Sequence, residues 1–294
     1  MRGRLVGVDV AGTYAVVTGA SSGIGRAVAL RLAGKGCRLV LVGREKERLD
    51  ELAGRTGGEA RAADLADKES TVALGRWLAA LDPAPDLLLN NAGIGAVADA
   101  SDADDGATGA AVTNATDDGE VPTGSSRVFR GADLERLLAV NFRAPIALTR
   151  AVLPGMLRRG SGHLGYVTSI AALLGVPRES SYAAVKAALH AYARSLHTEV
   201  ATRGVGVSII APGIVDTEFF TRRGEPHGRR FPRPMSPDRV AAAIVRAIER
   251  ESAEVIVPGW LRIPVVLQAV APTTYARLAG RHARPPSTPP PPPP

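Results

Sequence analysis

A tyrosine and a lysine four residues apart, Tyr182 and Lys186 in the segment YAAVK, are the first candidates for acid–base chemistry. Residues i and i+4 share one face of a helix, so the phenol and the ammonium can point into one site. A free tyrosine has a pKa of about 10, and a nearby cation makes a phenol more acidic. Only four of the 36 basic residues are lysines, which favours a specific role for Lys186. The alternative is a half-buried tyrosine beside a surface lysine.

Two further polar residues are predicted to lie near this pair. Ser169 closes an expected strand thirteen residues before Tyr182, where a hydroxyl at the carboxyl edge of a parallel sheet faces the ligand crevice. It could hold a substrate carbonyl oxygen, although a strand-end cap is the better explanation for this serine taken singly. Asn141 lies inside an expected helix, where asparagine is unfavourable unless its amide is used. It could bind a water that links Lys186 to solvent, or make a structural hydrogen bond to a neighbouring backbone.

A glycine-rich turn at residues 18–25 (TGASSGIG) joins the first expected strand to the first expected helix. A helix start offers free N–H groups and a positive dipole end, and glycine lets the backbone approach a phosphate. This context favours a dinucleotide pyrophosphate over an ordinary turn. Gly43 and Arg44 end the second expected strand without an acid that could accept ribose hydroxyls. NADP is therefore favoured over NAD, although a solvated arginine would give the same pattern.

Short apolar segments alternate with helical patterns along most of the chain. Continuous apolar strands between helices are typical of a parallel sheet covered on both faces. We therefore expect a single doubly wound, Rossmann-like α/β domain with about seven strands over residues 1–284. The expected strands are residues 14–18, 38–42, 59–63, 86–89, 163–169, 205–211 and 254–257. The expected helices are residues 24–33, 45–53, 67–80, 133–158, 181–203 and 237–250.

Two segments differ in composition from this pattern. Residues 97–130 are rich in Gly, Asp and Thr, and residues 97–127 carry seven acids and one arginine. Such a segment cannot bury enough apolar surface to offset the entropy of ordering it, so a disordered insertion is expected. An acidic docking segment is the less favoured alternative. Residues 285–294 are expected to form a disordered proline-rich tail.

Composition limits the class of protein. The 294-residue chain has a formal charge of +7, but its arginines are scattered, so no nucleic-acid partner is expected. Cys37 is the single cysteine, which excludes an internal disulfide, and the five histidines lack metal-ligand spacing, so no metal site is expected. We find no clean apolar stretch of 18 residues and no secretory signal pattern, so the expected location is cytoplasmic.

Together these motifs resemble the short-chain dehydrogenase/reductase family, in its branch with TGxxxGxG and YxxxK motifs. The resemblance covers about residues 10–257, apart from the insertion, and implies the strand order 3-2-1-4-5-6-7. The matching motifs are TGASSGIG at 18–25, Asp64-Leu65, NNAG at 90–93, Asn141, Ser169, YxxxK at 182–186, and Pro212-Gly213 followed by Thr217.

The resemblance implies a role for each matching residue. Tyr182 would be the acid/base, and Lys186 would hold the nicotinamide ribose hydroxyls and make the phenol more acidic. Ser169 would orient the carbonyl, and Asn141 would complete a proton relay. The implied cofactor-binding residues are Gly19, Ser21, Ser22, Gly23, Ile24, Gly25, Arg44, Asp64, Leu65, Asn91, Ala92, Gly93, Tyr182, Lys186, Pro212, Gly213, Ile214 and Thr217.

The implied reaction is hydride transfer between NADP(H) and a small-molecule carbonyl or alcohol. A catalytically silent NADP-binding sensor or scaffold is the alternative. Residues 218–236 lie where the family has its substrate lid, and a homodimer or homotetramer is expected from the resemblance. The apolar segment 258–279 could pack on the lid or contact another subunit. A membrane-surface contact ranks second, because prolines interrupt any long amphipathic helix in this segment.

Overall fold

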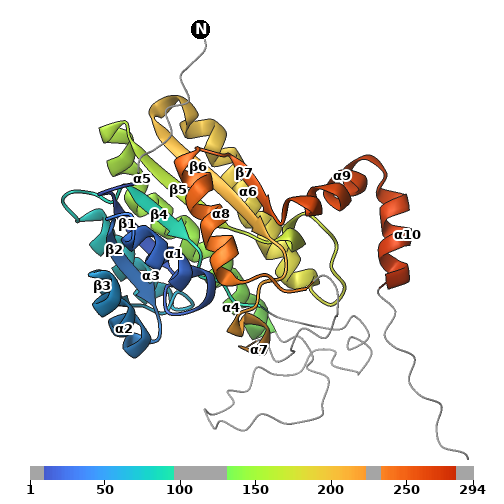
Figure 1. Cartoon of the computed structure of the whole chain (residues 1–294), viewed down its shortest axis with the longest axis horizontal. Helices are drawn as coiled ribbons and strands as arrows, with labels where there is room; N and C mark the ends of the chain where they lie inside the picture. Colours follow the sequence, from blue (N-terminus) through green and yellow to red (C-terminus); the bar gives the residue numbers. More distant parts are fainter. Residues whose placement is uncertain (1–9, 96–130, 223–232, 283–294) are drawn as a thin grey trace, which may run out of the picture.

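Seven parallel strands form a single sheet in the computed structural model, which describes residues 10–95, 131–222 and 233–282 (Figure 1). The strands are β1 (Tyr14–Thr18), β2 (Arg38–Gly43), β3 (Glu59–Ala62), β4 (Leu87–Asn90), β5 (Gly162–Val167), β6 (Val205–Pro212) and β7 (Glu254–Val257). Their spatial order is β3-β2-β1-β4-β5-β6-β7, which confirms the predicted topology. Because β1 pairs with both β2 and β4, the strand order reverses at β1, and a crevice for ligands is expected at the carboxyl ends of these strands.

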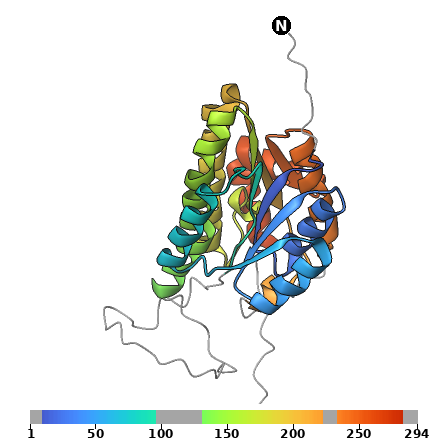
Figure 2. The ribbon, with the colours of Figure 1, turned by 90° about the vertical axis from the view of Figure 1, so that its left-hand side faces the viewer.

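Helices cover both faces of the sheet, as Figure 2 shows. The helices of the main body are α1 (Gly23–Ala33), α2 (Lys46–Thr56), α3 (Lys68–Ala79), α4 (Gly131–Leu138), α5 (Ala144–Arg159), α6 (Ser180–Val200), α7 (Glu218–Arg222) and α8 (Pro237–Glu249). Successive strand residues point to opposite faces, so Val17 packs in the core with α1 and α8. Its neighbour Val16 packs in the other core, with α3, α5 and α6.

The long helix predicted over residues 133–158 is divided in the structure. A five-residue π turn, Ala139–Arg143, separates α4 from α5 and includes Asn141. Pro145 follows this turn and has no N–H to donate to the carbonyl of Asn141, so a regular α-helical ladder cannot continue there. The turn leaves Asn141 completely buried beside the site.

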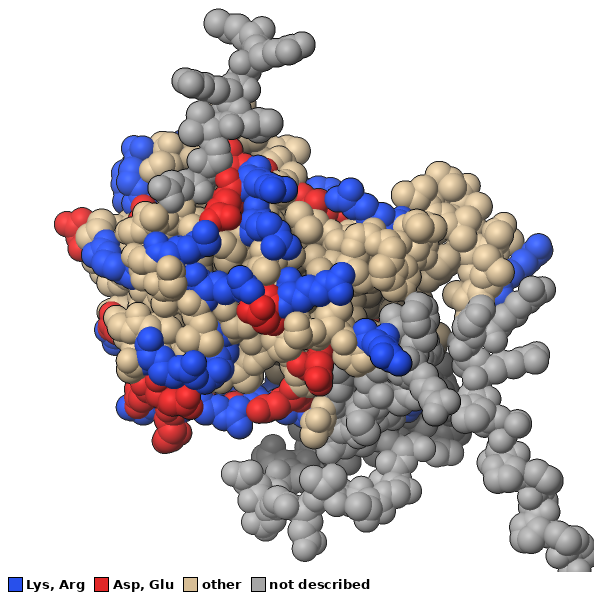
Figure 3. Space-filling model, in the orientation of Figure 1, with Lys and Arg blue, Asp and Glu red and all other residues tan. Residues whose placement is uncertain are grey.

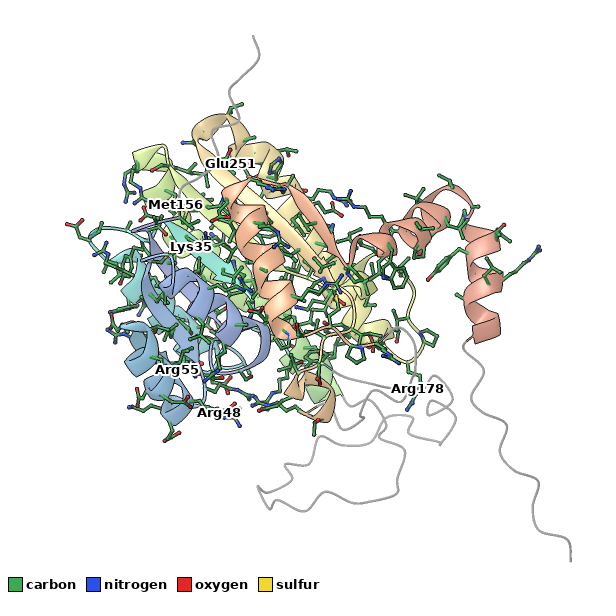
Figure 4. The ribbon with its side chains drawn as sticks, viewed as in Figure 1. Lys35, Arg48, Arg55, Met156, Arg178 and Glu251 are labelled. Carbon is green, nitrogen blue, oxygen red and sulfur yellow. The ribbon has the colours of Figure 1, made fainter. Side chains whose placement is uncertain are left out.

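The helical run over residues 134–159 is long and apolar enough to cross a membrane by length and composition. However, Leu148, Val152 and Met156 are buried between the sheet and α3. Met156, labelled in Figure 4, lies in the last turn of α5. The run is therefore explained as a core helix of the α/β fold.

The C-terminal segment forms two helices that the sequence pattern did not predict, α9 (Arg262–Val270) and α10 (Pro272–His282). Pro264 lies in the first turn of α9 and Pro272 opens α10, where a missing N–H breaks no hydrogen bond. The prolines therefore delimit two helices. The predicted insertion 97–130 and tail 285–294 lie outside the described residues, and so do residues 223–232 of the predicted lid.

Candidate active site

The buried hydroxyl of Thr18, at the end of β1, joins two of the predicted motifs. It donates a hydrogen bond to the Leu89 carbonyl (3.1 Å) and accepts from the N–H groups of Asn91 (3.0 Å) and Ala92 (3.1 Å). The Asn91 amide donates in turn to the Thr18 carbonyl (2.9 Å). The glycine-rich turn and the NNAG segment are thereby held together at the carboxyl edge of the sheet. Sequence reasoning did not assign Thr18 a role, although a hydroxyl ending a buried strand was a usable signal.

The turn after β1 requires glycine at two positions. Gly19 has φ +67°, and a Cβ there would lie 2.8 Å from the Cα of Ala92. A Cβ on Gly25 would lie 2.1 Å from the Gly19 carbonyl oxygen. The turn can therefore pack this closely on α1 only with a glycine at position 25. Ser22 precedes α1, and its side chain makes no capping hydrogen bond. The first N–H groups of α1 thus lack a side-chain cap, which fits a pyrophosphate at this helix start.

The predicted adenosine end lies at the ends of β2 and β3. The Ser21 hydroxyl is 3.4 Å from the position of a Cβ on Gly43, which brings the glycine-rich turn against β2. Arg44 is exposed, and no carboxylate among the described residues pairs with it. Asp64 accepts a hydrogen bond from the Ala66 N–H (2.9 Å), and Leu65 is buried. The exposed guanidinium and the ordered turn after β3 can accept an adenosine 2′-phosphate and an adenine ring.

An ion-pair network not predicted from the sequence links α7 to α2. Arg48, labelled in Figure 4, pairs with Glu45 (2.9 Å) and with Glu218 (2.9 Å). Arg222 pairs with Glu45 (2.7 Å) and with Glu218. Hydrogen bonds from Arg222 and Arg48 lower the pKa of the Glu218 carboxyl. The network occupies the only carboxylate within two residues of the β2 end, Glu45, so this acid is already neutralised by arginines.

Tyr182 and Lys186 share one face of α6, as their spacing predicts, and both side chains are buried there. Lys186 is 3% exposed, and its ammonium donates a hydrogen bond to the Val167 carbonyl at 3.2 Å. A Cβ on Gly93 would lie 3.2 Å from Lys186 Nζ and 2.8 Å from Asn141 Oδ1, so three motifs meet here. Burial lowers the pKa of Lys186 to about 8. An ammonium has three donors, and among the described residues one is used, which leaves two for ribose hydroxyls.

The Tyr182 ring lies in an apolar cluster with Leu137, Ala171 and Val185, and is 7% exposed. Its centroid is 5.6 Å from that of Phe219 in the predicted lid and 5.9 Å from Lys186 Nζ. The lysine ammonium is thus close enough to act electrostatically on the phenol.

Ser169 and Asn141 each make a structural hydrogen bond of the kind considered as an alternative to a functional role. Ser169 Oγ accepts from the Ala171 N–H (3.1 Å), which leaves its own hydrogen to donate to a carbonyl oxygen. The Asn141 amide accepts from the Ile94 N–H (3.2 Å) and donates to the Ile94 carbonyl (2.9 Å). The Ser169 geometry is compatible with both roles, whereas a water-binding role for the Asn141 amide stays a prediction.

The segment after β6 closes the predicted nicotinamide end. The Gly213 N–H donates to the Val257 carbonyl (2.7 Å), and the Ile214 carbonyl accepts from the Met235 N–H (2.9 Å). The Thr217 methyl group lies 3.0 Å from the position of a Cβ on Gly23. Pro212 ends β6, and Thr217 shortly after it lies against the glycine-rich turn, so both ends of the predicted dinucleotide site lie at one edge of the sheet.

Comparison with known proteins places this geometry in a family. A profile described as short chain dehydrogenase matches residues 13–227. Dehydrogenase/reductase SDR family member 7B of Bos taurus is 30% identical over 291 residues, which cover 92% of this chain and 81% of that protein. An uncharacterized oxidoreductase of Staphylococcus saprophyticus is 31% identical over 252 residues, which cover 83% of this chain and 94% of that protein. A short-chain dehydrogenase from Sphingobium yanoikuyae, solved in complex with NADPH, has a TM-score of 0.72 and 26% identity, covering 94% of this chain and 98% of that chain. This chain belongs to the short-chain dehydrogenase/reductase family and is an oxidoreductase.

Proposed function

We propose that this protein transfers hydride between NADP(H) and a carbonyl or alcohol substrate, with Tyr182 as the acid/base. The observation that carries the proposal is the buried ammonium of Lys186, which lies one helical turn from Tyr182 and against Gly93 and Asn141. A buried cation with unused donors needs a polar partner, and cofactor ribose hydroxyls are such a partner.

The chain's own groups supply position and charge for the reaction. In reduction, Ser169 donates a hydrogen bond to the carbonyl oxygen, and Tyr182 then transfers its phenolic proton to that oxygen. The Lys186 ammonium favours the phenolate that remains, and it acts strongly because few waters screen it at 3% exposure. When bound, the nicotinamide supplies or accepts the hydride at C4. Phe219 borders the Tyr182 ring and would exclude water from the reacting atoms.

The preference for NADP rests on charge at the carboxyl end of β2. Arg44 is exposed there without a carboxylate partner among the described residues, so its guanidinium is available to a 2′-phosphate. The nearby Glu45 is paired with Arg48 and Arg222, so it cannot repel that phosphate strongly. Arg44→Ser should raise the KM for NADPH about tenfold and leave that for NADH unchanged. More efficient use of NADH than NADPH by the wild-type protein would contradict this preference.

The acid/base assignment is tested with a panel of carbonyls and alcohols, followed by absorbance of the reduced cofactor. Tyr182→Phe should lower kcat by about 10²–10⁴-fold while NADPH binding, measured by fluorescence titration, persists. Tyr192→Phe is the matched control, because Tyr192 lies on the same helix but packs against Tyr166, away from Lys186. Turnover that survives in Tyr182→Phe would refute the assignment. Tight NADPH binding without turnover of any compound would favour the silent sensor or scaffold.

A further inference from the structure

The C-terminal arm, residues 259–282, extends away from the sheet and its covering helices (Figure 1). It consists of a short 3₁₀ turn, Gly259–Leu261, followed by α9 and α10. The two helices contact one another, and α9 contributes no buried residue. This exposure is unusual, because seven of the nine residues of α9 are apolar when Pro264 is included. On average α9 is more apolar than the helices of similar length in the main body, α1, α2, α3 and α8. The arm therefore presents apolar surface that the described part of the chain does not cover.

Three exposed apolar side chains lie on one side of α9. Ile263, Val266 and Val270 are 71%, 58% and 75% exposed, and their spacing of three and four residues puts them on one helical face. Trp260, in the turn before α9, and Leu278, on α10, are 45% and 42% exposed. The described residues include only two other exposed large apolar side chains, Val72 and Leu134, and both belong to the main body. An apolar face this concentrated is a sign of an interaction surface.

The charge of the arm restricts the partner. Residues 255–294 contain four arginines and no aspartate or glutamate. Arg262, next to Ile263 in the chain, and Arg277, on α10, are exposed, and the face of the arm visible in Figure 3 is tan and blue without red. In a two-fold contact between copies, the same patch would face itself, and arginines without acids would meet. The arm is better complemented by a surface that has negative charge outside and an apolar layer beneath it. An anionic bilayer is such a surface.

The base of the arm is fixed to the catalytic edge of the sheet. Leu261 is buried in an apolar cluster with Ala211, Ile256 and the partly buried Ile170, next to Ser169. A Cβ on Gly213 would lie 2.7 Å from the Leu261 side chain, so the arm starts beside the predicted nicotinamide segment. A contact made by the arm would therefore hold this edge of the molecule near the contacted surface.

We propose that the C-terminal arm docks on an anionic lipid surface. Ile263, Val266 and Val270 enter the boundary between headgroups and acyl chains, with Trp260 at the headgroup level. Arg262 and Arg277 lie close to the lipid phosphates. The docking is peripheral, since α9 is nine residues long and a spanning helix needs about 20.

Co-sedimentation of the full chain with vesicles tests the proposal. The wild-type protein should bind vesicles of phosphatidylcholine with phosphatidylglycerol, bind phosphatidylcholine alone more weakly, and dissociate as salt is raised. The triple variant Ile263→Ser, Val266→Ser, Val270→Ser should lower the partition coefficient at least about tenfold. Arg262→Gln and Arg277→Gln should each lower it about fivefold on anionic vesicles only.

Val72→Ser is the matched control, because Val72 is an exposed valine on α3, outside the arm. NADPH titration and thermal unfolding verify that each variant is folded. Absence of wild-type binding to anionic vesicles would overturn the proposal, and so would equal binding by the folded triple variant. Light scattering that shows a wild-type dimer, a monomeric triple variant and no vesicle binding by either would identify a second copy as the occupant instead.

Discussion

Replacing Lys186 with methionine removes the most deeply buried charge of the site, and we expect the variant to be inactive but more stable at neutral pH. Methionine has a similar length and no charge, so it can occupy the same buried space. The lysine is 3% exposed, and burial lowers its pKa from 10.5 to about 8. Burial of the charged ammonium therefore lowers the unfolding free energy of the wild-type protein at pH 7. The methionine variant has no buried charge, so its unfolding free energy is not lowered in this way.

The magnitude follows from the pKa change. A fall from 10.5 to about 8 corresponds to about 3 kcal/mol at pH 7. The variant also loses the hydrogen bond to the Val167 carbonyl, about 1 kcal/mol, so its net gain in unfolding free energy is about 2 kcal/mol. Below pH 8 the lysine is charged in both the folded and the unfolded protein, and the cost is complete. Between pH 8 and 10.5 the unfolded state binds more protons, so wild-type stability rises with pH and the advantage of the variant disappears.

Urea unfolding of the cofactor-free proteins at neutral pH and at pH 10.5 measures this difference. All other titrating groups are common to both proteins, so the change in the difference with pH reports Lys186. Lys35→Met is the control, since Lys35 is 44% exposed, pairs with Glu249 on the surface, and should show no such gain (Figure 4). A variant less stable than wild type at pH 7, or a gain that persists at pH 10.5, would refute the reasoning.

Three further substitutions test the scaffold of the site. Gly25→Ala should weaken NADPH binding at least about tenfold in a fluorescence titration, because its Cβ would lie 2.1 Å from the Gly19 carbonyl oxygen and displace the start of α1. Thr18→Val should lower the unfolding free energy by about 2–4 kcal/mol, because two partly buried N–H groups lose their acceptor, and Thr18→Ser should restore it. His163 has a pKa lowered to about 4 by burial and by His197, so stability should fall as pH drops from 6.5 to 4, and His163→Gln should flatten that fall in urea unfolding.

The sheet could be predicted closely because its strands are continuous apolar runs. The predicted strand 14–18 coincides with β1, and the parallel sheet follows from alternation of strands and helices, whereas its strand order was implied by the family resemblance. The predicted strand 163–169 instead ends at Val167, with Thr168 still bonded to the Ile210 carbonyl of β6, and Ser169 accepts the Ala171 N–H and precedes a 3₁₀ turn. A side-chain hydrogen bond to the local backbone decides such an end, and apolar patterning does not record it.

For the site, the sequence indicated which residue types lie at strand ends and on one helix face, since both follow from local periodicity. The roles of the individual residues stay predictions, which the substitutions above test. The sequence did not indicate the ion pairs between α2 and α7, because Arg48 and Glu218 are 170 residues apart in the chain.

The sequence alone determined the parallel α/β architecture, the glycine-rich turn and the shared face of Tyr182 and Lys186, because each depends on residues within a few positions of one another. Only the tertiary structure decided how deeply Lys186 is buried, that Gly93 and Asn141 lie against one another, and that the described part of the chain leaves Ile263, Val266 and Val270 exposed. Burial and exposure depend on which distant segments pack together, and that packing is a property of the whole fold.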